Sequence, residues 1–403
     1  MKKIKKILTI LIIVLTFNFS YVNAESFDIT SKNVILYNLN DDSVLYEKNS
    51  NEKVQIASLT KIMTAIVAIE NIDNLDEEVI IKSDVFEGIE EYSQAGLKIG
   101  DKVTYKDLLY GVILPSGADA VNALVLNISS SEKEFIKLMN EKANSLGLKN
   151  TKFDNAIGMD SEDNYSTASD LAKILIYALK NDTFKTIYTT KKYTIESLNL
   201  NLKSTLTTYA KKIDTSNILG SKSGFTDKAG VCLSSIATID NVNYLLIVLG
   251  ANTSSKSNAV KDSLEIYDYY SKNYSYKTII KKNQVFDTIK VKWGKKEEYE
   301  IKSNEDIELY LKNTVSEDEI EYNYKGIEEL NYKIKKGTKL GTVTVKYKDD
   351  VLTTYDVYLD ETLSYYHPVI YSIIIVALIL MILSLIQMKK AKKKRRKKKK
   401  KNK

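Results

Sequence analysis

Hydrophobic positions alternate as in strands at both ends of the first 270 or so residues and recur at helical spacing between them. Alternation over 34–39 and 44–47, around a polar turn, predicts a β-hairpin, and the apolar runs 231–239 and 244–250 predict buried strands. Apolar residues three and four apart predict one helix that begins near residue 57. The same spacing predicts further helices over 106–114, from 118 onward, and over 132–146, 168–179 and 257–270. This order predicts an α+β domain, with helices packed on one sheet, over residues 25–273.

The pattern changes after Tyr274. Short alternating segments, separated by turn residues, follow at 288–293, 298–301, 307–311, 320–324, 342–347 and 353–358. They predict a small all-β domain over residues 274–362, without a recognisable catalytic constellation.

The first residues have the pattern of a secretory signal. Four lysines precede the apolar stretch 7–19, and Val22-Asn23-Ala24 offers the small residues that a signal peptidase reads. We expect a signal peptide over residues 1–24 with cleavage after Ala24; an uncleaved anchor helix is the alternative.

The C-terminal end predicts a transmembrane helix. Residues 369–388 carry no charge and are long enough to span the hydrocarbon core. The basic tail 389–403 then stays in the cytoplasm, with the folded part outside the cell and Tyr365, Tyr366 and His367 at the outer interface. The tail is also expected to bind anionic lipids, although a plain stop-transfer signal explains it equally well.

Charge and composition exclude several functions. The net charge of +7 contains four basic residues at the start and thirteen after residue 388, so the remainder carries about −10 and does not indicate nucleic-acid binding. The single cysteine, Cys232, cannot form an internal disulfide. The single histidine, His367, lies at the membrane edge, which argues against a Ser-His-Asp triad and a histidine-based zinc site. A hydrolase of this sequence must take its base from Lys, Asp, Glu or Tyr, and no metal or cofactor is expected.

A serine three residues before a lysine on a helix supplies such a base. Both side chains lie on one face, and the lysine can accept a proton once its pKa is lowered. The pairs are Ser50 with Lys53, Ser58 with Lys61, and Ser130 with Lys133. Only the second opens a strongly amphipathic helix, which favours Ser58 as the nucleophile.

Two later motifs fit the same chemistry. Ser116 lies 58 residues after Ser58, in a break between helical stretches, and Lys222-Ser223-Gly224 follows 106 residues further on, just before an apolar strand. A second serine can relay a proton to a leaving amine, and a cation beside a hydroxyl can hold a substrate carboxylate. A glycine there lets substrate lie close to the strand.

The order and spacing of these motifs resemble those of penicillin-binding proteins and serine β-lactamases. Residues 57–64, Ala-Ser-Leu-Thr-Lys-Ile-Met-Thr, and 222–227, Lys-Ser-Gly-Phe-Thr-Asp, are similar to the low-molecular-mass D-alanyl-D-alanine carboxypeptidases. The resemblance implies an α/β-sandwich catalytic domain followed by a small β domain and a membrane anchor. It also implies removal of the terminal D-alanine from peptidoglycan stem pentapeptides and inhibition by β-lactams.

The resemblance implies a role for each motif residue. Ser58 is acylated, Lys61 is its general base, and Ser116 shuttles a proton. The terminal carboxylate is bound by Lys222 and Ser223, and the oxyanion by the backbone N–H groups of Ser58 and Phe225. Gly224 lies between Ser223 and Phe225 in the sequence and lets the substrate approach the strand backbone.

The second motif departs from the family pattern, because Ser116-Gly117-Ala118 stands where Ser-x-Asn is usual. One hypothesis is that Asn122, or water, replaces the missing amide; the alternative is that Asn122 is an ordinary surface residue of the helix. The loop 154–158, which contains a glycine, is assigned only a structural role.

Two other functions stay open. A β-lactamase is the nearest enzyme, although the Glu-x-x-Leu-Asn pattern of class A enzymes is missing between the second and third motifs. A catalytically weak scaffold that binds peptidoglycan is the alternative from another class, with Ala118 as the sign of lost activity.

Overall fold

The computed structural model describes residues 26–366 and 368–401. The expected signal peptide, residues 1–24, and His367 lie outside the described residues. The described chain divides into two compact units, one ending at Lys272 and the other beginning at Asn273.

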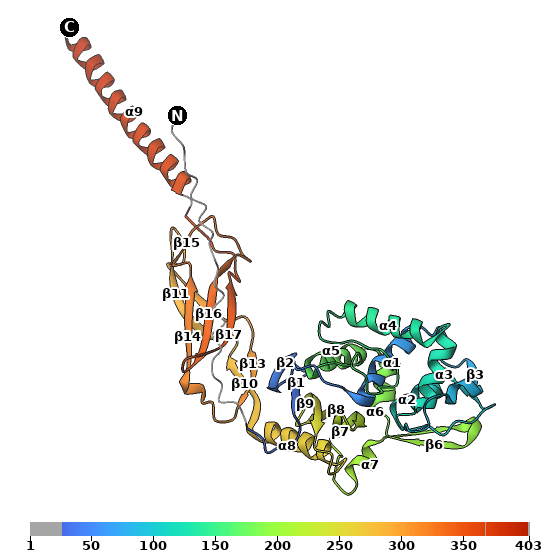
Figure 1. Ribbon diagram of the computed structural model, residues 1–403. Helices are drawn as coiled ribbons and strands as arrows, with labels where there is room; N and C mark the ends of the chain where they lie inside the picture. Colours follow the sequence, from blue (N-terminus) through green and yellow to red (C-terminus); the bar gives the residue numbers. More distant parts are fainter. Residues whose placement is uncertain (1–25, 367, 402–403) are drawn as a thin grey trace, which may run out of the picture. The chain divides into compact units, whose positions relative to one another are not determined.

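The first unit is built on a five-stranded antiparallel sheet in the order β2-β1-β9-β8-β7 (Figure 1). Its N-terminal hairpin, β1 and β2, therefore joins the later strands through the pairing of β1 with β9. The bounds are β1 Asn33–Asn38, β2 Ser43–Lys48, β7 Ile218–Thr226, β8 Gly230–Ile239 and β9 Val242–Ala251. As the outermost strand, β7 leaves one of its backbone edges without a neighbouring strand.

Helices cover both faces of this sheet. Ser234 and Ser235 are successive residues of β8 and so point to opposite faces. The Ser234 hydroxyl pairs with the Tyr188 hydroxyl of α6, whereas the Ser235 hydroxyl pairs with that of Tyr267 on α8. The helices are α1 Thr60–Glu70, α2 Tyr105–Ile113, α3 Ala118–Ile128, α4 Glu132–Ser145, α5 Ala168–Ala178, α6 Asp182–Thr189, α7 Leu206–Ala210 and α8 Asn258–Asn273. The predicted α+β fold is confirmed.

The central helix of the first unit is α1, which is preceded by a 3-10 turn, η1, over Ala57–Leu59. Its residues from Thr60 to Ala68 are all buried, including Lys61. The sequence did not predict α6, α7 or two short antiparallel strand pairs, β3 Glu78–Ile80 with β4 Lys102–Thr104 and β5 Lys192–Ile195 with β6 Leu200–Lys203. These elements are too short for hydrophobic periodicity to reveal them.

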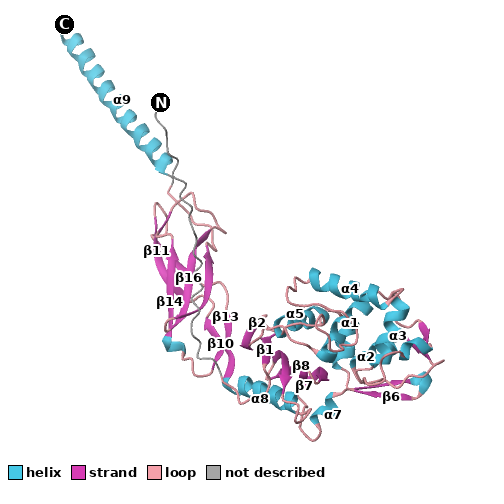
Figure 2. Ribbon diagram, viewed as in Figure 1, coloured by secondary structure: helices cyan, strands magenta, loops and turns pink. Residues whose placement is uncertain are grey.

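The second unit contains the predicted β domain (Figure 2). Its sheets are β14-β16-β17, β12-β11-β15 and the pair β10-β13, and they enclose a core that includes Ile301, Leu330 and Val343. The bounds are β10 Tyr274–Ile280, β11 Val285–Val291, β12 Glu298–Lys302, β13 Ile307–Lys312, β14 Ile320–Gly326, β15 Glu329–Leu330, β16 Lys339–Tyr347 and β17 Asp350–Tyr358. All six predicted strands are present, and β10 and β15 are additions.

The last element is the helix α9, Pro368–Lys401. Its stretch Val369–Lys398 is long and apolar enough to cross a membrane, and its apolar side chains are exposed. The helix continues without a break into the basic residues that follow Met388.

The buried strand β9 offers a test of the packing. Leu245 is fully buried in the core of the first unit, whereas Leu219 on β7 is 43% exposed. We expect Leu245→Ala to lower the free energy of unfolding of this unit by about 2–5 kcal/mol, because it leaves a cavity. Leu219→Ala should change that free energy by about 0.5 kcal/mol or less. Urea titration followed by far-ultraviolet circular dichroism measures both, and equal effects would contradict the packing described.

Candidate active site

Ser58 lies at the entrance to the central helix, in the 3-10 turn before α1. The preceding Ala57 has φ 46°, in the left-handed region that residues with a side chain seldom adopt. The loop that contains Gly158 packs directly on this turn, since a Cβ on Gly158 would overlap the carbonyl group of Ala57. The backbone before Ser58 is thus held in an uncommon conformation by close contact with a glycine.

Lys61 is one helical turn further along and almost fully buried, with 1% of its surface exposed. Its Nζ donates hydrogen bonds to Ser58 Oγ at 3.1 Å and to the carbonyl oxygen of Ile157 at 2.6 Å. Burial lowers the pKa of the Lys61 ammonium to about 7, against a smaller opposing effect of the Asp119 charge. Near neutral pH this amine therefore exists partly in the form that can accept a proton.

Ser116 lies in the break between α2 and α3, where Pro115 prevents the helix from continuing. It also has a left-handed backbone, with φ 66°. Lys222 Nζ donates to Ser116 Oγ at 2.8 Å and to the carbonyl oxygen of Ser223 at 2.8 Å. Burial, together with the charge of Lys61, holds the pKa of the Lys222 ammonium well below its usual range.

The outer edge of β7 completes the site. A Cβ on Gly224 would lie 3.1 Å from the backbone nitrogen of Ser58, so this strand passes very close to the turn that carries the serine. The hydroxyl groups of Ser223 and Thr205 are 2.5 Å apart. The three sequence motifs are thus brought together from η1, the α2–α3 break and β7.

These residues line a cleft of about 470 Å³. Ser58, Lys61, Ser116, Ser223, Gly224 and Phe225 are all on its wall, which is completed by Glu91, Tyr92, Ser93, Thr205, Thr208, Tyr209 and Lys256. Six of the seven residues predicted for the site thus line one cavity. The seventh, Lys222, is fully buried, and its Nζ donates to the hydroxyl group of Ser116 and to the carbonyl oxygen of Ser223.

Two side chains that sequence reasoning missed also shape the site. Lys256, in the loop before α8, lines the cleft with its Nζ 5.1 Å from the centre of the Phe225 ring. Asp119 is fully buried and accepts hydrogen bonds from the backbone N–H groups of residues 95, 96, 97 and 120. Its position in the first turn of a helix was a weak signal for such a role, whereas nothing in the local sequence distinguishes Lys256 from other surface lysines.

The hypothesis that Asn122 replaces the missing amide is wrong. Its Nδ2 donates to the carbonyl oxygen of Val85 at 2.9 Å, and the side chain does not line the cleft. Ala118 is itself fully buried in the apolar core. The loop 154–158 does more than the structural role assigned to it, because the carbonyl group of Ile157 binds Lys61.

The other two serine–lysine pairs are not active sites. The hydroxyl of Ser50 donates to Glu47 at 2.7 Å, and that of Ser130 donates to Glu134 at 2.7 Å. Each of these serines therefore pairs with a nearby carboxylate, as in an ordinary turn or helix start.

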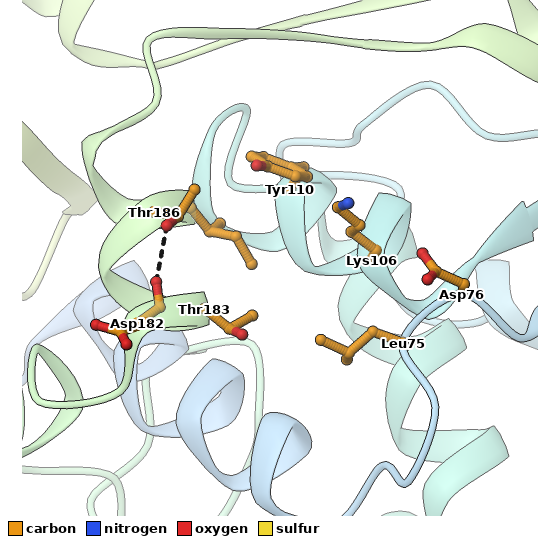
Figure 3. Close-up of a pocket in the computed structure, with 8 residues that line it drawn as sticks. Leu75, Asp76, Lys106, Tyr110, Asp182, Thr183 and Thr186 are labelled. Atoms are coloured by element: carbon orange, nitrogen blue, oxygen red, sulfur yellow. Dashed lines mark hydrogen bonds between the residues drawn. The ribbon is translucent and has the colours of Figure 1, made fainter.

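A second pocket, of about 320 Å³, lies in the same unit (Figure 3). It is lined by Leu75, Asp76, Lys106, Tyr110, Asp182, Thr183, Thr186 and Ile187. The hydrogen bond drawn there, from the Thr186 hydroxyl to the Asp182 carbonyl oxygen at 2.8 Å, is internal to α6. Its lining contains no serine and its lysine is exposed, so it lacks the buried serine–lysine arrangement of the first cleft.

Among the described residues, no group of three or more His, Cys, Asp or Glu side chains is placed to bind a metal ion.

Comparison with known proteins agrees with this geometry. The family described as D-alanyl-D-alanine carboxypeptidase matches residues 20–253, and the one described as penicillin-binding protein 5, C-terminal domain, matches residues 274–365. The D-alanyl-D-alanine carboxypeptidase DacF of Bacillus subtilis is 33% identical over 337 residues, which cover 80% of this chain and 83% of that protein.

Solved structures match as well. Penicillin-binding protein 5 from Haemophilus influenzae superimposes with a TM-score of 0.65 at 23% identity, covering 85% of this chain and 99% of that one, and so supports the fold. The Streptomyces K15 DD-transpeptidase superimposes with a TM-score of 0.55 at 33% identity, covering 61% of this chain and 98% of that one. The chain therefore belongs to the D-alanyl-D-alanine carboxypeptidase family, the serine peptidases of the low-molecular-mass penicillin-binding group.

Proposed function

We propose that this protein removes the terminal D-alanine from peptidoglycan stem pentapeptides through an acyl-enzyme on Ser58. The observation that carries the proposal is the 3.1 Å separation between Lys61 Nζ and Ser58 Oγ on the wall of a cleft. None of the described residues that line the cleft is a histidine, so the buried lysine is the base available to that hydroxyl.

Acylation begins when neutral Lys61 takes the proton of Ser58 and Oγ bonds to the carbonyl carbon of the penultimate D-alanine. The oxyanion that forms is held by the backbone N–H groups of Ser58 and Phe225. Two features support this role: N–H groups in a first helical turn have no partner within the helix, and β7 has an open edge. Each such donor contributes about 2.7–4 kcal/mol to the transition state.

The peptide bond then breaks and its nitrogen must gain a proton. Ser116 gives its hydroxyl proton to that nitrogen and recovers one from Lys222, whose Nζ lies 2.8 Å from Ser116 Oγ. The proton that Lys61 took from Ser58 passes on to Lys222, so Lys61 is neutral again. D-Alanine leaves and water attacks the ester. Lys61 takes a proton from the water and returns it to Ser58 Oγ as the ester bond breaks. A β-lactam would acylate the same serine and stay bound.

The terminal carboxylate of the substrate is recognised by hydroxyl groups backed by cations. Ser223 and Thr205 line the cleft, and Lys222 Nζ donates to the Ser223 carbonyl oxygen; a carboxylate bound at these hydroxyls would favour the protonated form of Lys222 and be attracted by its charge. Lys256 adds an exposed cation on the wall of the same cleft. This arrangement supports specificity for a chain end over an internal peptide bond.

We further propose that α9 anchors the protein in the membrane. The basic residues at its end would remain in the cytoplasm and bind anionic headgroups, which leaves the catalytic unit outside the cell. Residues 1–24 would be removed as a signal peptide during export.

The direct test is release of D-alanine from a stem pentapeptide together with labelling by a fluorescent penicillin. The wild-type protein should release D-alanine and bind one label, and Ser58→Ala should do neither. Prompt turnover of nitrocefin, in place of a single stoichiometric burst, would identify a β-lactamase instead. Intact protein that takes no label would be the scaffold.

The lowered pKa of Lys61 predicts the pH dependence of acylation. Below pH 7 the ammonium is protonated and cannot accept the serine proton, so the rate should fall about tenfold per pH unit. The rate should rise through pH 7 and level off above it. The second-order rate constant for penicillin acylation between pH 5 and 10 measures this profile, and a rate that is still climbing at pH 10 would show an ordinary lysine.

Asp119 is a positioning residue whose replacement should change both geometry and pH profile. Its two oxygens accept N–H groups from Ala95, Gly96 and Leu97, next to the cleft wall, and its charge raises the pKa of Lys61. Asp119→Asn places an amide NH₂ donor against some of these N–H donors. The lost hydrogen bonds should lower the free energy of unfolding by about 1–3 kcal/mol. We expect at least a tenfold loss of kcat/KM and a midpoint of the pH profile shifted below 7.

The matched control is Asp101→Asn, because Asp101 also accepts a loop N–H group, that of Lys98 at 2.7 Å, without acting on Lys61. It should leave the midpoint in place. An unchanged midpoint in Asp119→Asn would limit Asp119 to a structural role.

A further inference from the structure

The tip of the β11–β12 hairpin carries an exposed tryptophan in a strained conformation. Trp293 has 54% of its surface exposed and φ 60°, a backbone region that bulky residues avoid. Such a conformation costs about 1–3 kcal/mol, and exposure of a large apolar ring adds no packing energy in return. Because neither the strained backbone nor the exposed ring stabilises the fold, we infer that the Trp293 side chain contacts something outside the fold.

Backbone hydrogen bonds tie this tip to the segment that precedes α9. The carbonyl oxygen of Trp293 accepts from the N–H of Tyr366 at 2.6 Å, and the N–H of Lys295 donates to the carbonyl oxygen of Ser364 at 2.8 Å. Gly294 and Tyr365 form a β-bridge between these two bonds. The hairpin tip and the chain entering the apolar helix are thus one hydrogen-bonded unit.

Chain length then limits how far Trp293 can lie from the membrane span. The apolar stretch begins at Val369, three residues after Tyr366, a distance of at most about 11 Å along an extended chain. This limit holds for any angle between α9 and the β domain. The headgroup region on each side of the hydrocarbon core is about 5–8 Å thick, so Trp293 lies within reach of it.

The exposed side chains at the tip are suited to that region. Tyr366 is 44% exposed and stands beside Trp293, and these two residue types are enriched at membrane interfaces. The ring of Tyr365, expected at the interface from sequence, packs instead against the core of the β domain. Two of the three lysines that flank Trp293 face carboxylates, Lys292 with Glu329 at 3.8 Å and Lys296 with Glu361 at 3.0 Å.

We propose that the hairpin tip, through Trp293 and Tyr366, docks into the headgroup region of the leaflet at the N-terminal end of α9. The proposal rests on α9 spanning the membrane, as proposed above, and adds a second contact that sets which end of the β domain faces the lipid. Because two of the three flanking lysines face carboxylates, the contact depends mainly on the aromatic rings and only weakly on anionic lipid.

The chain offers a direct probe, because Trp293 is its only tryptophan. The full-length protein is reconstituted in phosphatidylcholine nanodiscs that contain lipids brominated at a shallow position. We expect strong quenching of Trp293 fluorescence by the brominated lipid and protection from acrylamide. The result should change little when one third of the lipid is phosphatidylglycerol, because the rings carry most of the contact.

A matched control carries the tryptophan elsewhere on the same domain, as Trp293→Phe combined with Val351→Trp. Val351 is equally exposed, at 54%, and is the second residue of β17, about 23 Å along the strand from Tyr358, which ends it. This probe should be open to acrylamide and insensitive to brominated lipid. If Trp293 behaves in the same way in protein that co-elutes with the discs, the docking proposal fails while anchoring by α9 stands.

Protein that does not co-elute with the discs would overturn the anchoring proposal and the docking proposal together.

A second variant, Trp293→Asn, separates lipid contact from folding. Asparagine tolerates the left-handed region, so the midpoint of thermal unfolding of the detergent-solubilised chain should stay the same or rise. A marked drop would mean that Trp293 serves the fold and would contradict the proposal.

Discussion

Burial of two lysines behind two serines is the constraint on which the site depends. Lys61 and Lys222 are withdrawn from water, and neither forms an ion pair with a carboxylate among the described residues. An isolated buried ammonium is costly, and loss of its proton removes that cost. The arrangement that would otherwise destabilise the fold thus supplies an amine able to accept a proton near neutral pH. A serine peptidase that does not use a histidine as its base requires such an amine.

The fold serves this burial by bringing distant segments very close together. The central position of α1 keeps Lys61 from water, while Gly158 and Gly224 allow a loop and a strand to touch the turn that carries Ser58. Asp119 ties the break after α2 to the neighbouring loop of residues 95–97. Close backbone contact, more than a large number of side-chain bonds, places the proposed nucleophile.

Hydrophobic periodicity was sufficient to predict the main strands and helices. Motif spacing was sufficient to predict that Ser58, Lys61, Ser116 and residues of β7 meet at one cleft, while their roles in catalysis stay a proposal. Contacts between segments that only folding brings together could not be predicted from periodicity or motif spacing. The binding of Lys61 by the Ile157 carbonyl group, and the position of Lys256 at the cleft, join segments far apart in sequence. Asn122 failed as a prediction because spacing along a helix indicates a face but not the neighbour that the face meets.

The central claim is that Lys61 is a neutral base near physiological pH. Its most direct test is the pH titration of the ¹³Cε resonance of Lys61 in the folded protein, assigned by comparison with Lys61→Arg. The account predicts a titration with a midpoint near 7. A midpoint near the ordinary value of about 10.4 would contradict it and would remove the base from the proposed mechanism.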